Sequence, residues 1–148
     1  INVRSAEQLF AEVHALYSDA DCFISAAAVA DFRVAEVAEQ KIKKHSDADE
    51  MILTLVKNPD IVAWVAQQED RPYVVGFAAE TQNVIEYAKD KLQRKNLDMI
   101  CANQVGETLG FEQNDNVLTL ITSEQELELP LSTKVELAVQ LLKFISVQ

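Results

Sequence analysis

The chain has 148 residues, 49% of them apolar, which is enough to build the core of one folded domain. It carries 24 Asp and Glu against 13 Lys and Arg, a net charge of −11, so binding to DNA or RNA through a broad basic face is not expected. No apolar run reaches the roughly 18 residues of a membrane span and no signal peptide opens the chain, so we expect a cytoplasmic protein with no membrane contact.

Cysteine, histidine and glycine are scarce. Cys22 and Cys101 both lie in apolar, strand-like runs, and we expect them to be reduced, buried and chemically inert. The two histidines form no cluster with the cysteines, so no metal site is predicted. With three glycines the chain has neither a GxGxxG turn nor a GxxxxGK[ST] loop.

The first elements alternate between helix and strand. Ser5, followed by Glu7 and Gln8, predicts a helix start with a capping box. The run "DCFISAAAVAD" predicts a strand buried on both faces that ends in small residues and an acid. Residues 33–50 are polar and aperiodic and predict a mobile loop, and residues 51–56 predict another strand.

The middle of the chain repeats this alternation. In "KNPDIVAWVAQQ", Asn58 is the expected N-cap and Pro59 the first helical residue. A buried strand is predicted over residues 72–80, and the next helix is expected to begin after Asn83 and to run to about Lys95.

The last third predicts one more buried strand, "LDMICAN", and then an antiparallel hairpin formed by "NVLTLIT" and "ELELPL". A final helix is expected from Ser132. Its inward-facing apolar stripe is predicted to consist of Val135, Ala138, Val139, Leu142 and Ile145.

These elements predict an α/β fold: a Rossmann-like, open, mostly parallel sheet with flanking helices and a C-terminal antiparallel hairpin, all within one domain, residues 1–148. Ligands of such sheets bind outside the carboxyl ends of the strands. Here those ends are small residues followed by polar ones, which let a ligand approach the backbone.

Positive charge is concentrated in two short stretches, "KIKKH" at 41–45 and the segment 89–95, which together hold seven of the 13 basic residues. Lys91 and Lys95 are four residues apart on a predicted helix and share a face, where two like charges repel. Two interpretations follow from the residues alone. The stretches are solvated surface, or they hold a small, highly charged anion between them.

Four motifs, in their order and spacing, carry a family resemblance: "SAAAVADFR…EQKIKKH", "VKNPDIV", "PYVVGFAAET" and "KDKLQRKNLDMICAN". The chain resembles bacterial phosphopantothenoylcysteine synthetase along essentially its whole length. That enzyme is the C-terminal half of a bifunctional coenzyme A biosynthesis protein. The resemblance implies a ligase that converts CTP and 4'-phosphopantothenate, assisted by Mg²⁺, into an acyl-cytidylate, which L-cysteine then attacks.

The resemblance also implies a set of site residues. Lys41 is the expected catalytic residue, since the matching flap lysine of the family acts in cytidylate formation. The residues expected to bind CTP are Asp31, Lys41, Pro59, Asp60, Ile61, Val62, Phe77, Lys91 and Lys95. Those expected to bind the acyl substrate are Ala27, Ala28 and, on the weaker ground of its place at a strand end, Asn103.

The family's Gly-rich segment would lie upstream of Ile1, and its flavin-dependent decarboxylase domain further upstream still. We therefore expect no FMN on this chain, and we expect the chain to be processed, truncated or incomplete. A homodimer is implied by the family. Two alternatives stay open: a nicotinamide-dinucleotide-binding Rossmann domain, and a non-catalytic nucleotide-binding or dimerisation module.

Overall fold

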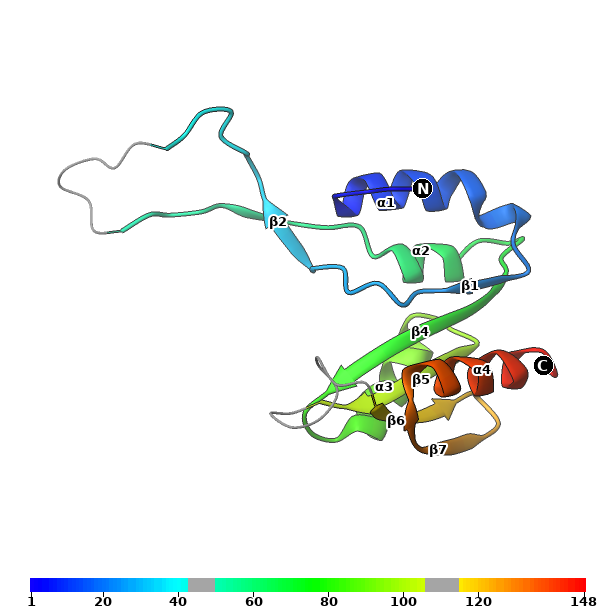
Figure 1. Ribbon diagram of the computed structural model, residues 1–148. Helices are drawn as coiled ribbons and strands as arrows, with labels where there is room; N and C mark the ends of the chain where they lie inside the picture. Colours follow the sequence, from blue (N-terminus) through cyan, green and yellow to red (C-terminus); the bar gives the residue numbers. More distant parts are fainter. Residues whose placement is uncertain (43–49, 106–114) are drawn as a thin grey trace.

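The computed structural model describes residues 1–42, 50–105 and 115–148. Its centre is a five-stranded sheet with the strand order β1-β4-β5-β6-β7 (Figure 1). Three neighbouring strands are parallel: β1 (Cys22–Ile24), β4 (Tyr73–Glu80) and β5 (Met99–Gln104). Two more continue the sheet as an antiparallel hairpin: β6 (Asp115–Ile121) and β7 (Glu126–Thr133). The predicted α/β class, the mostly parallel sheet and the C-terminal hairpin are confirmed.

Helices cover both faces of this sheet. One face is covered by α1 (Ala6–Leu16), which continues into the short 3₁₀ turn η1 (Tyr17–Asp19), by α2 (Ile61–Ala66) and by α3 (Val84–Arg94). The other face is covered by α4 (Lys134–Ile145). A hydrophobic core lies on each face of the sheet, and β4 contributes to both. Val74 packs toward α2 and α3, whereas Val75 packs toward α4.

The predicted cap of α1 is present, with one difference. Ser5 Oγ accepts a hydrogen bond from the Gln8 amide at 3.2 Å, as the sequence predicted. The Gln8 side chain accepts from the Arg4 amide at 2.8 Å rather than from Ser5, so the box closes one residue earlier. At α3, Asn83 holds the N-cap position in a left-handed conformation, φ 49°, without a side-chain hydrogen bond to the helix.

The segment after β1 departs from the prediction. Residues 33–50 were expected to be a loop, yet β2 (Phe32–Val34) pairs antiparallel with β3 (Leu55–Lys57) in a separate two-stranded sheet. The strand expected over residues 51–56 is therefore shorter, and it does not join the main sheet. Figure 1 shows β2, β3 and their described extensions, residues 32–42 and 50–57, reaching away from the body; we call this segment the arm.

The start of α2 also differs. Asp60, not Asn58, is the N-cap, since Asp60 Oδ1 accepts from the Ala63 amide at 3.2 Å. Asn58 is engaged elsewhere: its Nδ2 donates to the Ala30 carbonyl at 2.8 Å, and its amide donates to the Asp31 carbonyl at 2.8 Å. These hydrogen bonds join the two segments that flank the arm, residues 30–31 and residue 58. Local capping patterns cannot predict such a tertiary contact.

The buried stripe predicted for the last helix is wrong. The helix begins at Lys134, where Thr133 and Glu136 form a capping box, and Leu137 and Leu141 face the sheet. Most of the predicted stripe is exposed, with Val135 at 74% and Leu142 at 56%. The helix is apolar on more than one face, so periodicity alone did not distinguish which face packs on the sheet.

Candidate functional site

A cleft of about 950 Å³ lies at the edge of the sheet where the parallel strands end. The topology brings the ends of five strands to this edge. The parallel strands β1, β4 and β5 end there. In the antiparallel hairpin, β6 begins and β7 ends at the same edge. The cleft is therefore located where open α/β sheets bind their ligands.

Eleven of the twelve predicted site residues line this cleft. They are Ala27, Ala28, Asp31, Pro59, Asp60, Ile61, Val62, Phe77, Lys91, Lys95 and Asn103. These residues come from the loop after β1, the start of α2, β4, α3 and β5, so the fold gathers positions that are up to 76 residues apart in sequence. The structure places these residues around one cleft; their individual roles remain predictions.

Small residues keep the cleft accessible down to the backbone. Ala26, Ala27 and Ala28 follow β1, and Gly76 lies on β4 in the middle of the lining. A Cβ added at Gly76 would approach Leu97 Cδ1 to 2.7 Å, which is closer than real Cβ atoms come to a neighbour. A larger residue at this position would therefore displace the Leu97 side chain, which is buried in the core.

Lys91 is half-buried in the cleft wall. Its Nζ donates a hydrogen bond of 2.8 Å to the Phe77 carbonyl on β4. Burial, followed by repulsion from Lys95, lowers the pKa of Lys91, and the carboxylates of Glu80, Asp60 and Asp31 only partly oppose this. A negative charge entering the cleft would therefore interact with a lysine whose positive charge is poorly compensated.

Lys95 has a carboxylate partner. Its Nζ lies 2.7 Å from Asp60 Oδ2, and the Lys95 side chain is 17% exposed. Burial disfavours the charged form of Asp60, but hydrogen bonds from Lys95 and the Ala63 amide, together with the nearby Lys95 and Lys91 charges, outweigh it and lower the pKa of Asp60. Asp60 thus stays ionised while it caps α2 and pairs with Lys95.

Lys41 is the one predicted site residue that does not line the cleft. It lies exposed on the arm, beyond β2. The rest of the basic stretch, Lys43, Lys44 and His45, is outside the described residues. The predicted contact between this stretch and a ligand phosphate is therefore not tested by the geometry.

Sequence reasoning missed seven polar residues that line the cleft: Ser25, Lys57, Asn58, Glu80, Arg94, Asn116 and Lys134. Lys57 directly precedes the "NPD" motif and Arg94 lies between the two predicted lysines, so the motifs themselves pointed to them. Lys134 is not among the predicted site residues, yet it lines the cleft. Its position depends on the register of the β6–β7 pair, which local patterns do not give.

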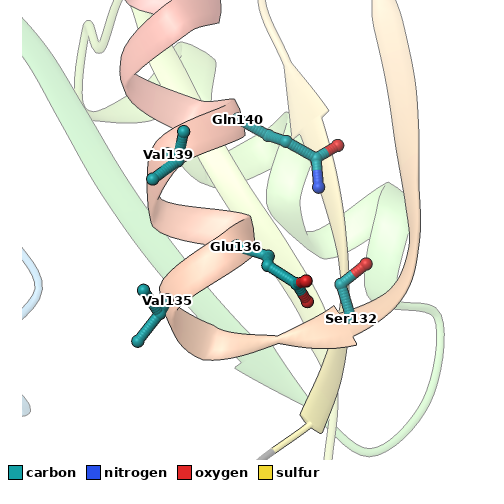
Figure 2. Close-up of a pocket in the computed structure, with 5 residues that line it drawn as sticks. All are labelled: Ser132, Val135, Glu136, Val139 and Gln140. Atoms are coloured by element: carbon teal, nitrogen blue, oxygen red, sulfur yellow. The ribbon is translucent and has the colours of Figure 1, made fainter.

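A second, shallower groove of about 340 Å³ lies on the outer side of α4 (Figure 2). Figure 2 shows Val135 and Val139 beside Glu136, Gln140 and Ser132. The only charged side chain in its lining, Glu136, is used in the capping box with Thr133. The groove therefore lacks the basic side chains that a phosphate ligand needs.

Metal ligation and thiol chemistry find little support in the described ranges. No group of three or more His, Cys, Asp or Glu side chains there is arranged to hold a metal ion. Both cysteines are free, and burial raises the pKa of Cys101 to about 12, which keeps its thiol protonated.

Among the described helices, none has the length and apolar character needed to cross a membrane.

The fold and the cleft define an open α/β protein of the Rossmann-like class with a partly polar cleft at the carboxyl edge of its sheet. Residues 1–147 match the family model of the DNA/pantothenate metabolism flavoprotein C-terminal domain, and the chain belongs to this family. The resemblance seen in the sequence motifs is thereby confirmed.

Two curated relatives are coenzyme A biosynthesis bifunctional proteins CoaBC. The protein of Vibrio vulnificus strain CMCP6 is 54% identical over 147 residues, which are 98% of this chain and 37% of the relative. That of Escherichia coli K12 is 52% identical over 145 residues, 96% of this chain and 36% of the relative. The chain thus spans little more than a third of the length of these relatives.

Solved structures agree with this assignment. The crystal structure of the C-terminal domain of a CoaBC protein superposes with a TM-score of 0.78 at 34% identity, covering 99% of this chain and 64% of that one. The DNA/pantothenate metabolism flavoprotein from Streptococcus pneumoniae gives a TM-score of 0.79 at 19% identity, covering 98% and 71%, and this second likeness supports the fold alone.

Proposed function

We propose that this chain is most of a synthetase domain that performs the CTP-dependent ligation of L-cysteine to 4'-phosphopantothenate, a step of coenzyme A biosynthesis. The observation that carries the proposal is the cleft, which gathers eleven of the twelve residues matched to the synthetase motifs. The relatives named as bifunctional coenzyme A biosynthesis proteins support the same assignment.

The proposed chemistry has two steps. A carboxylate oxygen of phosphopantothenate attacks the α-phosphorus of CTP, a C–O–P anhydride forms, and pyrophosphate leaves. The amine of cysteine then attacks the acyl carbon, an amide bond forms, and CMP leaves with loss of a proton from the amine. The first step makes a poor electrophile reactive, so the protein mainly has to position the ligands and stabilise charge around the phosphates.

The charges of the cleft suit these roles. Lys91 and Lys95 are proposed to contact the triphosphate, while Asp31 is proposed to bind the ribose hydroxyl groups. Ala27 and Ala28 leave space for the acyl substrate beside the end of β1. Lys41 is proposed to stabilise the charge that develops as pyrophosphate leaves.

Mg²⁺ fits this cleft as a companion of the nucleotide rather than as a resident ion. The carboxylates of Asp31, Asp60 and Glu80 line the cleft, but among the described residues they form no metal-binding group of three. Mg²⁺ commonly binds through one or two carboxylates and substrate phosphates. When bound, the ion would neutralise part of the phosphate charge.

Calorimetric titration of the chain with CTP, ATP, GTP and NAD, each with Mg²⁺, tests the assignment. We expect CTP to bind more tightly and to stabilise the fold more than the other nucleotides. Equal heats for CTP and ATP would remove the cytidine assignment. Preferential binding of NAD would favour the dinucleotide-binding alternative, and binding of CTP without turnover in the complete protein would favour a non-catalytic module.

We also propose that the arm forms the interface of a homodimer. Its described residues expose large apolar side chains, which is costly for a surface that stays in water: Phe32 at 53%, Met51 at 60%, Ile52 at 93%, Leu53 at 59% and Leu55 at 55%. Light scattering after size exclusion should show a dimer that Ile52→Asp dissociates. Val135→Asp, on the other exposed apolar surface, serves as the control. Dissociation by Val135→Asp instead would assign the interface to α4.

A further inference from the structure

The ion pair between Lys95 and Asp60 lies inside the cleft and joins two of its walls. Lys95 follows the last residue of α3, whereas Asp60 caps the first turn of α2, and Nζ and Oδ2 are 2.7 Å apart. The Lys95 side chain is 17% exposed and the Asp60 side chain 50%. The carboxylate is therefore the more accessible partner from the cleft.

Asp60 uses its two carboxylate oxygens for two different tasks. Oδ1 accepts from the Ala63 amide at 3.2 Å and caps α2, while Oδ2 accepts from Lys95. An N-cap requires only one side-chain oxygen, and asparagine caps helices about as well as aspartate. The helix therefore does not explain why the side chain at position 60 is charged.

The charge at Asp60 is unfavourable for a phosphate ligand at Lys95. A phosphate oxygen that reached Lys95 Nζ would come close to a second negative group, and the two would repel each other. The lysine ammonium is a compact charge that rotates freely to new acceptors. Exchange of the acceptor therefore costs little movement of Lys95.

We propose that Asp60 is a positioning residue for Lys95: its carboxylate holds the ammonium as a substitute for a ligand phosphate and is exchanged for that phosphate when a polyphosphate binds. The inference rests on the proposed function for the identity of the ligand, the triphosphate of a nucleotide. If Asp60 contacted the ligand directly, it would raise the affinity of the cleft for that ligand. As a competitor for Lys95, Asp60 instead lowers this affinity.

The deciding variant is Asp60→Asn, which keeps an oxygen for the Ala63 amide and removes the charge. Its affinity for CTP and for pyrophosphate should increase about two- to fivefold, as expected for the loss of a competing, partly exposed ion pair. The midpoint of chemical unfolding should stay close to that of the wild type, since the cap is retained. Glu126→Gln is the matched control, because it removes one charge from the Lys89–Glu126 pair at 2.8 Å, and neither residue lines the cleft.

A double-mutant cycle shows whether Asp60 acts through Lys95. In a Lys95→Gln background, Asp60→Asn should no longer increase affinity, because there is no ammonium left to release. An increase of the same size in both backgrounds would mean simple repulsion, and a loss of affinity in Asp60→Asn would mean a direct contact; either result overturns the inference.

The pyrophosphate titration separates this inference from the proposed function. If CTP binds no better than ATP while Asp60→Asn still tightens pyrophosphate, the nucleotide assignment fails and the role of Asp60 stands. If the wild type and Asp60→Asn do not differ for pyrophosphate, as followed by amide shifts in the 148-residue chain, the role of Asp60 is overturned whatever the nucleotide result.

Discussion

Lys91 illustrates how the fold makes one lysine suited to an anion. Its side chain lies along β4, with its Nζ on the Phe77 carbonyl, and Lys95 lies one turn further along the same face. Both burial and the like charge disfavour the ammonium, so its pKa is lowered. The negative charge of a phosphate beside it would offset both effects and favour the charged lysine, and this is the physical basis for the first prediction.

We expect Lys91→Ala and Lys95→Ala each to weaken CTP binding by about 1.5–3 kcal/mol, the usual contribution of a charge-assisted hydrogen bond. The loss should be larger at low salt. The pKa of Lys91 is lowered, so as the pH rises this lysine loses its charge earlier than an ordinary lysine does. CTP binding by the wild type should therefore begin to weaken at a correspondingly lower pH.

Isothermal titration of the complete protein measures this effect, with Lys143→Ala as the control because Lys143 is exposed in the last turn of α4. Unchanged CTP affinity in both cleft variants would show that the two lysines are only a solvated surface.

The second prediction concerns Lys41, which lies exposed on the arm rather than in the cleft. Lys41→Gln keeps the length of the side chain and removes its charge. If Lys41 stabilises charge during cytidylate formation, pyrophosphate release in the complete protein should fall by orders of magnitude while CTP affinity changes little, since the contact acts on the transition state. Normal turnover in a coupled pyrophosphate assay would leave Lys41 without a catalytic role.

The family motifs predicted eleven residues of the cleft lining, fewer than half of it, because several of these motifs contain strand ends and those ends meet at one edge of a parallel sheet. Residues that depend on long-range pairing escaped prediction. Asn58 was taken for a helix cap, but its side chain bonds to Ala30, 28 residues earlier. Local capping rules contain no information about such a partner.

At the level of elements, the C-terminal hairpin and the start of α4 extend the cleft beyond the parallel strands. Asp115 pairs with Thr133 and Asn116 with Ser132, so the last residue of β7 lies at the carboxyl edge of β5. Lys134 follows immediately and lines the cleft. A hairpin that seemed only to widen the sheet therefore places a positive charge at the ligand site.

Lys134→Ala should accordingly weaken binding of a phosphate-bearing ligand by about tenfold, as expected for the loss of one charge-assisted contact. Separate titrations with CTP and with 4'-phosphopantothenate will show which of the two it contacts. The control is again Lys143→Ala on the same helix. If both ligands bind the Lys134→Ala variant as they bind the control, Lys134 is a bystander at the rim of the cleft.

Periodicity predicted the existence and type of nearly every element, but not the packing of the arm or of α4. The arm pairs residues 32–34 with residues 55–57, a contact across 20 intervening residues, most of which were predicted to be a loop. In α4 several faces are apolar, and burial of Leu137 and Leu141 was decided by the sheet they cover. Both errors arise where tertiary contacts outweigh the local pattern.

At the level of the whole molecule, the cleft is formed at one end of a sheet whose outer parallel strand, β1, pairs in the described residues only with β4. A strand with one free edge readily accepts another strand or segment. The relatives are much longer than this chain. The family resemblance implies a Gly-rich segment that is not among residues 1–148. We expect that segment to complete the acyl-substrate side of the cleft.

The last prediction follows from this arrangement. Residues 1–148 alone should bind CTP weakly at most and should form no phosphopantothenoylcysteine. Addition of the upstream segment of a CoaBC relative, as a fusion or a separate fragment, should restore turnover. The assay supplies phosphopantothenate, CTP, Mg²⁺ and cysteine and follows pyrophosphate. Full activity of the 148-residue chain would place the acyl-substrate site within the residues already present.

The position of Cys101 in the centre of the sheet has a practical consequence. Its side chain is completely buried in the core that joins β5 to α4, and its thiol has a pKa of about 12, while Cys22 at the edge strand is partly exposed. A thiol reagent attacks only the exposed thiolate. Labelling of Cys22 will thus follow local fraying of β1, and labelling of Cys101 will follow opening of the whole sheet. The two native cysteines therefore report local and global unfolding separately, and mass spectrometry of the labelled chain distinguishes them without any introduced cysteine.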